Sequence, residues 1–159
     1  MEVEKGILNN RKTNRVVSES GMTFTFDQYA VEGDKKAKKL FEFVADHTEV
    51  EWSLSGVGAV AGEEGSNILT TSHIENSEIG GGYLVSRGYT LRKHIHSHPY
   101  NLKPSAGDKE FVEWVTKRFG FEKAEFYIYR NKKYYRYNEN GLLVLQEYNI
   151  EPLIITPDK

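Results

Sequence analysis

The stretch from residue 96 to residue 108 collects side chains that bind divalent cations. It contains His96-Ser-His-Pro and then Ser105-Ala-Gly-Asp, with six residues between His98 and Ser105. If residues 94–98 form a strand, His96 and His98 point the same way, about 6.6 Å apart along the backbone. Zinc enzymes commonly use three protein ligands and leave the fourth position to water. We therefore expect His96, His98 and Asp108 to hold one zinc ion, while other divalent ions stay open.

Each of these residues also has an ordinary structural interpretation. Ser105 and Asp108 fit the start of a helix, where a hydroxyl and a carboxylate bind exposed backbone N–H groups. Taken alone, that interpretation is the better one, and an isolated His-x-His pair often occurs by chance. The histidine pair and the Ser105–Asp108 pair together favour a metal site. The reason is that the tight His-Pro exit from the strand returns Ser105 and Asp108 towards the two histidines.

The other histidines do not favour a second metal. His94 shares a strand face with His96, but it follows two basic residues and is expected at the surface rather than in the site. His98 is followed by Pro-Tyr and lacks the Asp-His continuation that a dinuclear hydrolase would need. The sequence therefore predicts a site for a single ion.

The hydrophobic pattern predicts one mixed α/β domain, with a single sheet flanked by amphipathic helices. Helices are expected over residues 35–46, capped by Asp34, and over residues 105–119. Strands are expected near residues 22–26, 49–60, 67–73, 89–96, 124–130 and 133–138, and over a last segment through Leu145. The order of these strands does not follow from the pattern.

Two segments lack a clear hydrophobic pattern. Residues 1–21 are polar and are expected to form a lead-in or tail, with the folded domain over residues 22–159. Residues 74–82 end in three consecutive glycines, which predicts a mobile backbone there. The glycines form either a flap beside the metal site or a plain connection between strands.

Composition excludes several classes of protein. The formal charge of −2 gives no electrostatic reason to expect a nucleic acid partner. No apolar run approaches the roughly 18 residues of a membrane span, and the first residues lack the apolar region of a secretory signal. The absence of cysteine excludes disulfide bonds, thiolate ligands and a cysteine nucleophile. These features leave the compartment open.

The metal-binding residues resemble those of the JAMM metallopeptidases in the MPN/JAB superfamily. The signature of that family is an upstream Glu, then His-Ser/Thr-His-Pro, a spacer and Ser-x-x-Asp, and the likeness covers about residues 49–110. It implies a JAB/MPN architecture of the cytidine-deaminase-like type, with one zinc ion on His96, His98 and Asp108. It also implies that Ser105 stabilises the tetrahedral intermediate and that a glutamate activates the zinc-bound water.

Two glutamates are candidates for that base. Glu49 and Glu51 lie on one face of the predicted strand, so alternation does not separate them. Bacterial relatives often have Glu-Trp-Ser here, which favours Glu51 and leaves Glu49 in reserve. The chain also departs from the family, which more often has seven residues where six separate His98 from Ser105. The loop before the helix can absorb this difference.

A narrower resemblance extends over about residues 35–110. It rests on Phe41-Glu-Phe-Val-Ala-Asp, Glu51-Trp-Ser, Leu69-Thr-Thr-Ser-His and His96-Ser-His-Pro-Tyr. These segments are similar to JAB-like toxin domains at the C-terminal ends of bacterial polymorphic toxins. The likeness implies the effector part of a longer exported chain and an immunity protein as a partner. The location itself stays open: the protein is either cytoplasmic or, if it is a toxin domain, exported as part of a longer chain.

The expected activity is zinc-dependent hydrolysis of an amide bond by a metal-activated water, in a protein or peptide substrate. A peptidase and an isopeptidase both fit. The alternative is a non-catalytic MPN-type interaction scaffold, although such scaffolds usually lose the ligands. A third interpretation, a nucleic acid hydrolase, would use the basic and tyrosine-rich residues 130–137. Alternating tyrosines are better explained as a hairpin that packs in a sheet, so no nucleic acid and no membrane partner is expected.

Overall fold

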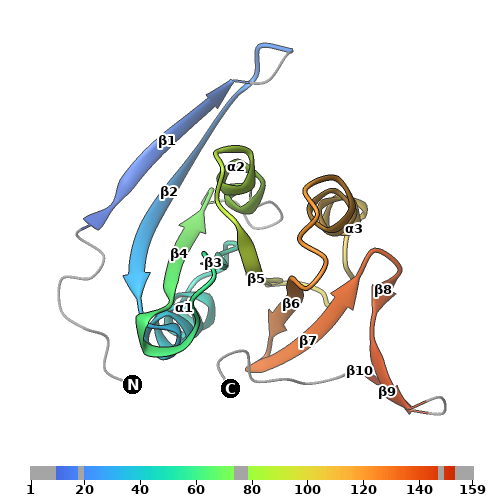
Figure 1. The fold of residues 1–159 in the computed structure, drawn as a ribbon. Coiled ribbons are helices and arrows are strands. Elements are labelled where there is room, and N and C mark those ends of the chain that lie inside the picture. Colours follow the sequence, from blue (N-terminus) through green and yellow to red (C-terminus); the bar gives the residue numbers. More distant parts are fainter. Residues whose placement is uncertain (1–9, 18–19, 74–78, 147–148, 153–159) are drawn as a thin grey trace.

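The computed structural model describes residues 10–17, 20–73, 79–146 and 149–152, and its main feature is an eight-stranded sheet (Figure 1). The strands of this sheet are β1 (Lys12–Val17), β2 (Thr23–Glu32), β3 (Ser53–Val57), β4 (Ser66–Thr71), β5 (Leu91–Ser97), β6 (Glu125–Arg130), β7 (Lys133–Asn138) and β8 (Gly141–Leu142). They lie in the order β1-β2-β4-β3-β5-β6-β7-β8, and only β5 and β6 run parallel. Two further strands, β9 (Val144–Gln146) and β10 (Asn149–Pro152), pair separately.

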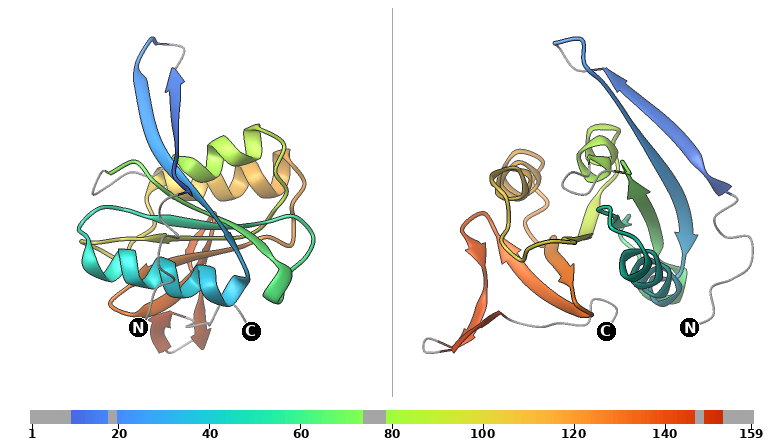
Figure 2. Two further views of the ribbon diagram at one scale, coloured as in Figure 1. Left: turned by 90° about the vertical axis from the view of Figure 1, so that its left-hand side faces the viewer. Right: turned by 180° about the vertical axis from the view of Figure 1, so that it is seen from behind.

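Helices cover both faces of the sheet. In the described part of the chain they are α1 (Asp34–His47), α2 (Gly80–Ser86) and α3 (Ala106–Glu113), with a short 3-10 turn, η2 (Gly62–Glu64), and a π-helical continuation of α3, η3 (Trp114–Arg118). Figure 2 shows α1 on one side of the sheet and α2 and α3 on the other. The mixed α/β class with helices flanking the main sheet is therefore confirmed, and the separate pair of β9 and β10 adds a small second sheet. Among these helices, none has the length and apolar character that crossing a membrane requires.

Alternation along the strands divides the core between the two faces. In β6, Tyr127 and Tyr129 join the buried cluster that contains the apolar side of α1. Their neighbours Phe126 and Ile128 join the cluster formed by α2 and α3. His96 of β5 pairs with Ile128 across the parallel ladder, and neighbouring residues in register share a face. This places His96 on the side of the sheet that α2 and α3 cover.

The start of α1 differs from the expectation that Asp34 caps it. Gly33 is the N-cap and Asp34 is the first helical residue. Its carboxylate instead accepts hydrogen bonds from the backbone N–H of Gly62 at 2.8 Å and the amide of Asn67 at 2.9 Å. Both terminal nitrogens of Arg92 also donate to it, at 2.9 and 3.2 Å. Asp34 therefore joins α1 to the η2 turn, β4 and β5.

Strand β1 lies within the segment that the sequence analysis treats as a lead-in or tail. It forms one edge of the sheet and pairs antiparallel with β2. Its pattern did not predict a strand, because Asn14 is the only buried residue among the six of β1. Polar side chains hold the pair together: Thr13 donates to Asp27 at 2.6 Å and Asn14 to Gln28 at 2.7 Å. The domain boundary at residue 21 stays a prediction.

The three glycines expected to form a flap or a connection are helical. Residues 74–78 lie outside the described part of the chain, but Gly80, Gly81 and Gly82 form the first turn of α2, and the first two are buried. A Cβ on Gly81 would lie 2.6 Å from Cε1 of His94 and 3.0 Å from the Phe111 ring. Glycine is therefore needed here for close packing, which lets α2 approach β5 and α3.

Candidate metal centre

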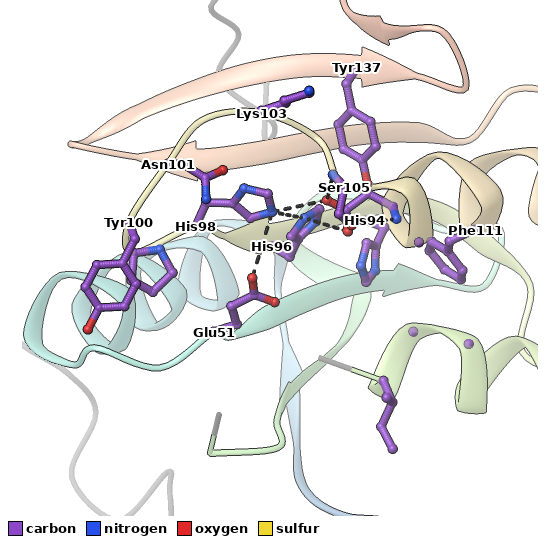
Figure 3. A pocket seen from close by; sticks show the side chains of 16 residues that line it. Glu51, His94, His96, His98, Tyr100, Asn101, Lys103, Ser105, Phe111 and Tyr137 are labelled. Atoms are coloured by element: carbon purple, nitrogen blue, oxygen red, sulfur yellow. Dashed lines mark hydrogen bonds and ion pairs between the residues drawn. The ribbon is translucent and has the colours of Figure 1, made fainter. Parts of the chain in front are cut away.

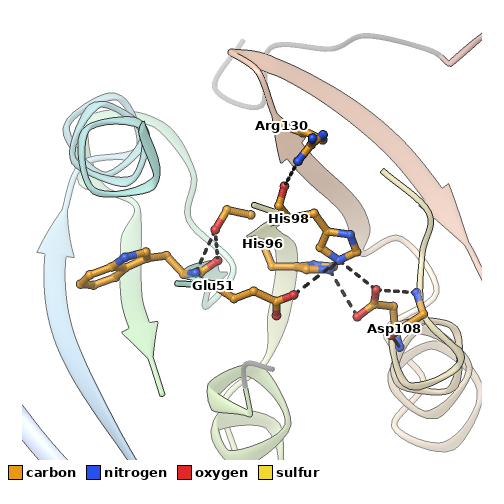
Figure 4. Close-up of polar contacts among 8 residues, drawn as sticks. Glu51, His96, His98, Asp108 and Arg130 are labelled. Atoms are coloured by element: carbon orange, nitrogen blue, oxygen red, sulfur yellow. Dashed lines mark hydrogen bonds and ion pairs between the residues drawn. The ribbon is translucent and has the colours of Figure 1, made fainter. Parts of the chain in front are cut away.

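Strand β5 positions the two histidines at its C-terminal end. His96 is the second-to-last residue of β5, and His98 follows the strand. The backbone of His98 is fixed on both sides, because its N–H donates to the carbonyl of Tyr129 at 3.1 Å and its carbonyl accepts from Arg130 at 2.9 Å (Figure 4). Both imidazoles are buried. The contacts with β6 therefore hold His98, the second predicted ligand, in place after β5 has ended.

The three predicted ligands converge on one point. Nε2 of His96 lies 2.8 Å from Nε2 of His98. The Asp108 oxygens lie 3.3 Å from the first nitrogen and 3.2 Å from the second. One ligand atom from each residue falls within 4.8 Å of the others. Atoms bound tetrahedrally to zinc at 2.0–2.1 Å are about 3.3 Å apart, so both distances to Asp108 fit that ion.

Helix α3 supplies the carboxylate through its first turn. Ser105 is the N-cap, and its hydroxyl accepts from the backbone N–H of Asp108 at 3.0 Å. The Asp108 carboxylate in return accepts from the backbone N–H of Ser105 at 2.8 Å. The helix-start and metal-site interpretations are therefore compatible, since the same carboxylate caps the helix and faces both histidines. The capping box fixes its orientation.

The electrostatics of the group suit a cation. Burial lowers the pKa of His96, although Asp108 opposes that shift. Burial alone would raise the pKa of Asp108, but its bonds to His96 and His98 hold the pKa well below the usual range. A metal binds neutral imidazole and ionised carboxylate. At neutral pH, His96 and Asp108 already have the protonation states that a metal requires.

Glu51 approaches the histidines from the side opposite Asp108 (Figure 4). Its Oε1 lies 3.9 Å from Nε2 of His98, and its side chain is largely buried in the wall of a cavity. Glu49 is exposed and lines a neighbouring cavity. The strand expected from residue 49 begins only at Ser53, so the two glutamates precede β3. Of the two candidates, Glu51 is the one beside the predicted ligands.

Ser97 fixes the segment that carries Glu51, and the sequence analysis gave this residue no role. Its hydroxyl accepts from the backbone N–H of Trp52 at 2.9 Å. Its own N–H donates to the carbonyl of Trp52 at 2.9 Å. On the other side, Thr71 donates to the carbonyl of Glu51 at 2.8 Å. The position of this serine between the two predicted metal ligands was the available signal for such a contact.

The group opens on a cavity of about 630 Å³ (Figure 3). Ser105 lies in its wall and is exposed, and His94 lies deeper. The surface position expected for His94 is wrong: it is 6% exposed, and its Nδ1 lies 3.0 Å from the hydroxyl of Ser55. Burial and the nearby His96 lower the pKa of His94 to about 3. His94 is therefore a neutral part of the cavity wall.

The tyrosine-rich segment forms the hairpin of β6 and β7, as expected. Tyr127, Tyr129, Tyr134 and Tyr137 are all buried. They pack against the two core clusters, so these rings are not arranged for stacking on bases.

Comparison with known proteins identifies the family. A sequence model described as "JAB-like toxin 1" matches residues 29–113, more than half of the chain. The matched region runs from β2 to the end of α3 and includes Glu51, His96, His98, Ser105 and Asp108. The chain belongs to the JAB-like toxin 1 family, which confirms the resemblance in the sequence. Neither a curated protein nor a solved structure matches the chain.

Proposed function

We propose that this chain is a zinc-dependent hydrolase that cleaves an amide bond in a protein or peptide, as the effector domain of a toxin. The observation that carries the proposal is the convergence of His96, His98 and Asp108 within 4.8 Å of one another, with Glu51 on the opposite side. Two neutral nitrogen donors and one carboxylate form a ligand set typical of catalytic zinc sites. A zinc ion held there lowers the pKa of water towards about 7 and polarises the scissile carbonyl.

Glu51 is the proposed general base. Its carboxylate accepts a proton from the attacking water and passes it to the leaving amine as the carbon–nitrogen bond breaks. Such proton transfer contributes about 10² to 10⁴-fold to the rate. The position of Glu51 supports this role, because it lies in the cavity wall near His98 and opposite Asp108. The bonds from Trp52 to Ser97 hold its backbone in place.

Ser105 is the proposed donor to the developing oxyanion. Its oxygen accepts the N–H of Asp108, which leaves the hydroxyl proton available for another acceptor. The residue is exposed in the cavity wall, so a substrate carbonyl can reach it. A donor that binds the transition state more tightly than the substrate raises the rate constant for the chemical step.

The family suggests the biological setting of this chemistry. A toxin domain with this activity would inactivate a protein target, and a dedicated immunity protein would be expected to block the cavity. The effector is proposed to be carried to its target as part of a longer exported chain. Both a peptide and an isopeptide bond suit a site that selects for an amide carbonyl.

The decisive experiment compares the wild type with Glu51→Gln and His96→Ala. We expect about one zinc per wild-type chain and per Glu51→Gln chain after purification without chelators, and little in His96→Ala. Expression of the wild type should slow cell growth and produce cleaved proteins, and both variants should be harmless. Full toxicity of Glu51→Gln would exclude it as the base. A wild type without zinc would instead favour a non-catalytic interaction module.

A further inference from the structure

Tyr137 is the one buried tyrosine of the β6–β7 hairpin whose hydroxyl has no hydrogen-bond partner among the described residues. The side chain is only 2% exposed. The other three hydroxyls each donate to a carboxylate: Tyr127 to Glu125, Tyr129 to Asp46 and Tyr134 to Glu42, at 2.7–2.8 Å. Buried polar groups are nearly always paired. The unpaired hydroxyl of Tyr137 therefore needs an explanation.

Its surroundings connect it to the metal centre. The ring of Tyr137 packs edge-on against His96, with centroids 5.7 Å apart. It enters the cavity wall from β7, with the hydroxyl end towards Ser105 and His96 (Figure 3). Burial, and then the charges of Asp108 and Glu51, raise the pKa of Tyr137 well above its ordinary value. The hydroxyl thus keeps its proton and can act as a donor.

The Asp108 carboxylate has three polar neighbours. Nε2 of His96 and Nε2 of His98 face its two oxygens, and the backbone N–H of Ser105 donates at 2.8 Å. Nδ1 of His98 is buried and has no partner in the described part of the chain, which favours the proton of that ring on Nε2. Because the two Nε2 atoms lie only 2.8 Å apart, one of them carries a proton and the other accepts, so one imidazole can donate to the carboxylate.

A bound cation would change this arrangement. The imidazoles bind a metal through nitrogen atoms that carry no proton, so neither Nε2 could continue to donate to Asp108. The carboxylate would then keep the backbone N–H of Ser105 as a donor and lose the imidazole donor. Metal-binding side chains are usually held by a further hydrogen bond from a neighbouring group. Tyr137 is a donor beside this site, and its hydroxyl has no other partner among the residues that the structure describes.

We infer that Tyr137 is a positioning residue for the metal centre, whose hydroxyl donates to the Asp108 carboxylate when a cation occupies the site. This inference rests on the proposed function, because it assumes that His96, His98 and Asp108 bind zinc. It assigns the unpaired hydroxyl to the loaded protein, where it replaces the imidazole donor. The metal-free protein gains nothing from that hydroxyl.

The test measures zinc affinity and metal-free stability in Tyr137→Phe, with Tyr134→Phe as the matched control. Both variants remove one buried hydroxyl from β7, but the hydroxyl of Tyr134 donates to Glu42 of α1. In competition with a chromophoric chelator, Tyr137→Phe should bind zinc about 10- to 100-fold more weakly than the wild type. Tyr134→Phe should stay within about twofold.

Urea unfolding without metal supplies the second readout. Tyr134→Phe should lower the folded-to-unfolded ratio about tenfold, because it removes a bond to a carboxylate. Tyr137→Phe should leave that ratio unchanged or raise it, because it removes an unpaired buried hydroxyl. A merely structural tyrosine would show the opposite pattern. A clear loss of metal-free stability in Tyr137→Phe would therefore overturn the inference.

The remaining outcomes separate this inference from the proposed function. Equal zinc affinity of wild type and Tyr137→Phe overturns the inference alone. If Tyr137→Phe binds zinc normally but the loaded protein binds acetohydroxamate more weakly, the hydroxyl acts on the substrate side, which also overturns it. A wild type that binds no zinc overturns the proposed function and this inference together.

Discussion

Ser97 and Trp52 hold each other by two hydrogen bonds across 45 residues of sequence. The hydroxyl of Ser97 accepts from the N–H of Trp52, and the N–H of Ser97 donates to the carbonyl of Trp52, both at 2.9 Å. Ser97 stands between the two histidines of the predicted metal centre, and Trp52 follows Glu51. This contact therefore sets the position of the proposed base relative to the proposed ligands.

Ser97→Ala should impair the proposed base, Glu51, without impairing zinc binding. The backbone bond remains, but the buried N–H of Trp52 loses its acceptor, which costs about 1–3 kcal/mol of stability. We expect the variant to bind zinc normally and to lose activity or toxicity. Ser97→Thr keeps a hydroxyl and should restore both the stability and the activity. Zinc content, urea unfolding and growth measure the three effects. Ser86→Ala is the control, because Ser86 is exposed and donates only to Tyr83 within α2. Loss of zinc in Ser97→Ala would contradict this separation.

Two substitutions at Ser105 should distinguish its roles in capping and in catalysis. Ser105→Ala removes the N-cap of α3 and should cost about 1 kcal/mol, whereas Ser105→Gly should cost only a few tenths. Both remove the proposed oxyanion donor and should reduce activity about 10² to 10³-fold. Similar activity losses with unequal stability losses would support both roles. Activity that follows stability instead would reduce Ser105 to a cap.

Local rules predicted the part of the site that lies within a short segment. Strand alternation placed His96 and His98 together, and the capping box placed Ser105 and Asp108 at the start of a helix. The hairpin of β6 and β7 was predicted almost to the residue. These features depend on contacts over a few residues, which the sequence pattern records.

Features that depend on distant contacts were missed. Strand β1 was not expected, because it is stabilised by polar pairs with β2 rather than by a buried apolar face. Helix α2 was not expected either, because three glycines oppose helix formation in isolation, and packing against β4 and β5 overrides that preference. Alternation could not choose between Glu49 and Glu51, because contacts from Ser97 and Thr71 fix that segment.

The glycine turn of α2 predicts opposite effects at two adjacent positions. Gly81→Ala would place Cβ 2.6 Å from His94 and 3.0 Å from Phe111. We expect the resulting strain to lower the free energy of unfolding by about 1–3 kcal/mol. At Gly82 no heavy atom of the described residues lies within 4 Å of the added Cβ, so Gly82→Ala should stabilise the helix by about 0.5–1 kcal/mol. Urea unfolding of both variants checks this. Destabilisation by Gly82→Ala would indicate that the turn must bend, as a flap would.

Asp34→Asn should reveal an acid-sensitive link between α1 and the sheet. Burial alone would raise the pKa of Asp34, but its bonds to Gly62, Asn67 and Arg92 outweigh that effect and lower it. The ordinary pKa of an aspartate is about 3.9. A folded-state pKa below that value means that the carboxylate stabilises the fold fully above about pH 4, and that this contribution disappears as the pH falls through the lower, folded-state pKa. At pH 7, we expect Asp34→Asn to lower the free energy of unfolding by about 1.5–3 kcal/mol. The difference from the wild type should shrink as the pH is lowered from 4.

The control is Glu113→Gln, whose pair with Lys117 is exposed and should contribute less than about 1 kcal/mol. Urea unfolding across the pH series measures both variants, and a difference for Asp34→Asn that is the same at pH 7 and pH 3 would contradict the assignment.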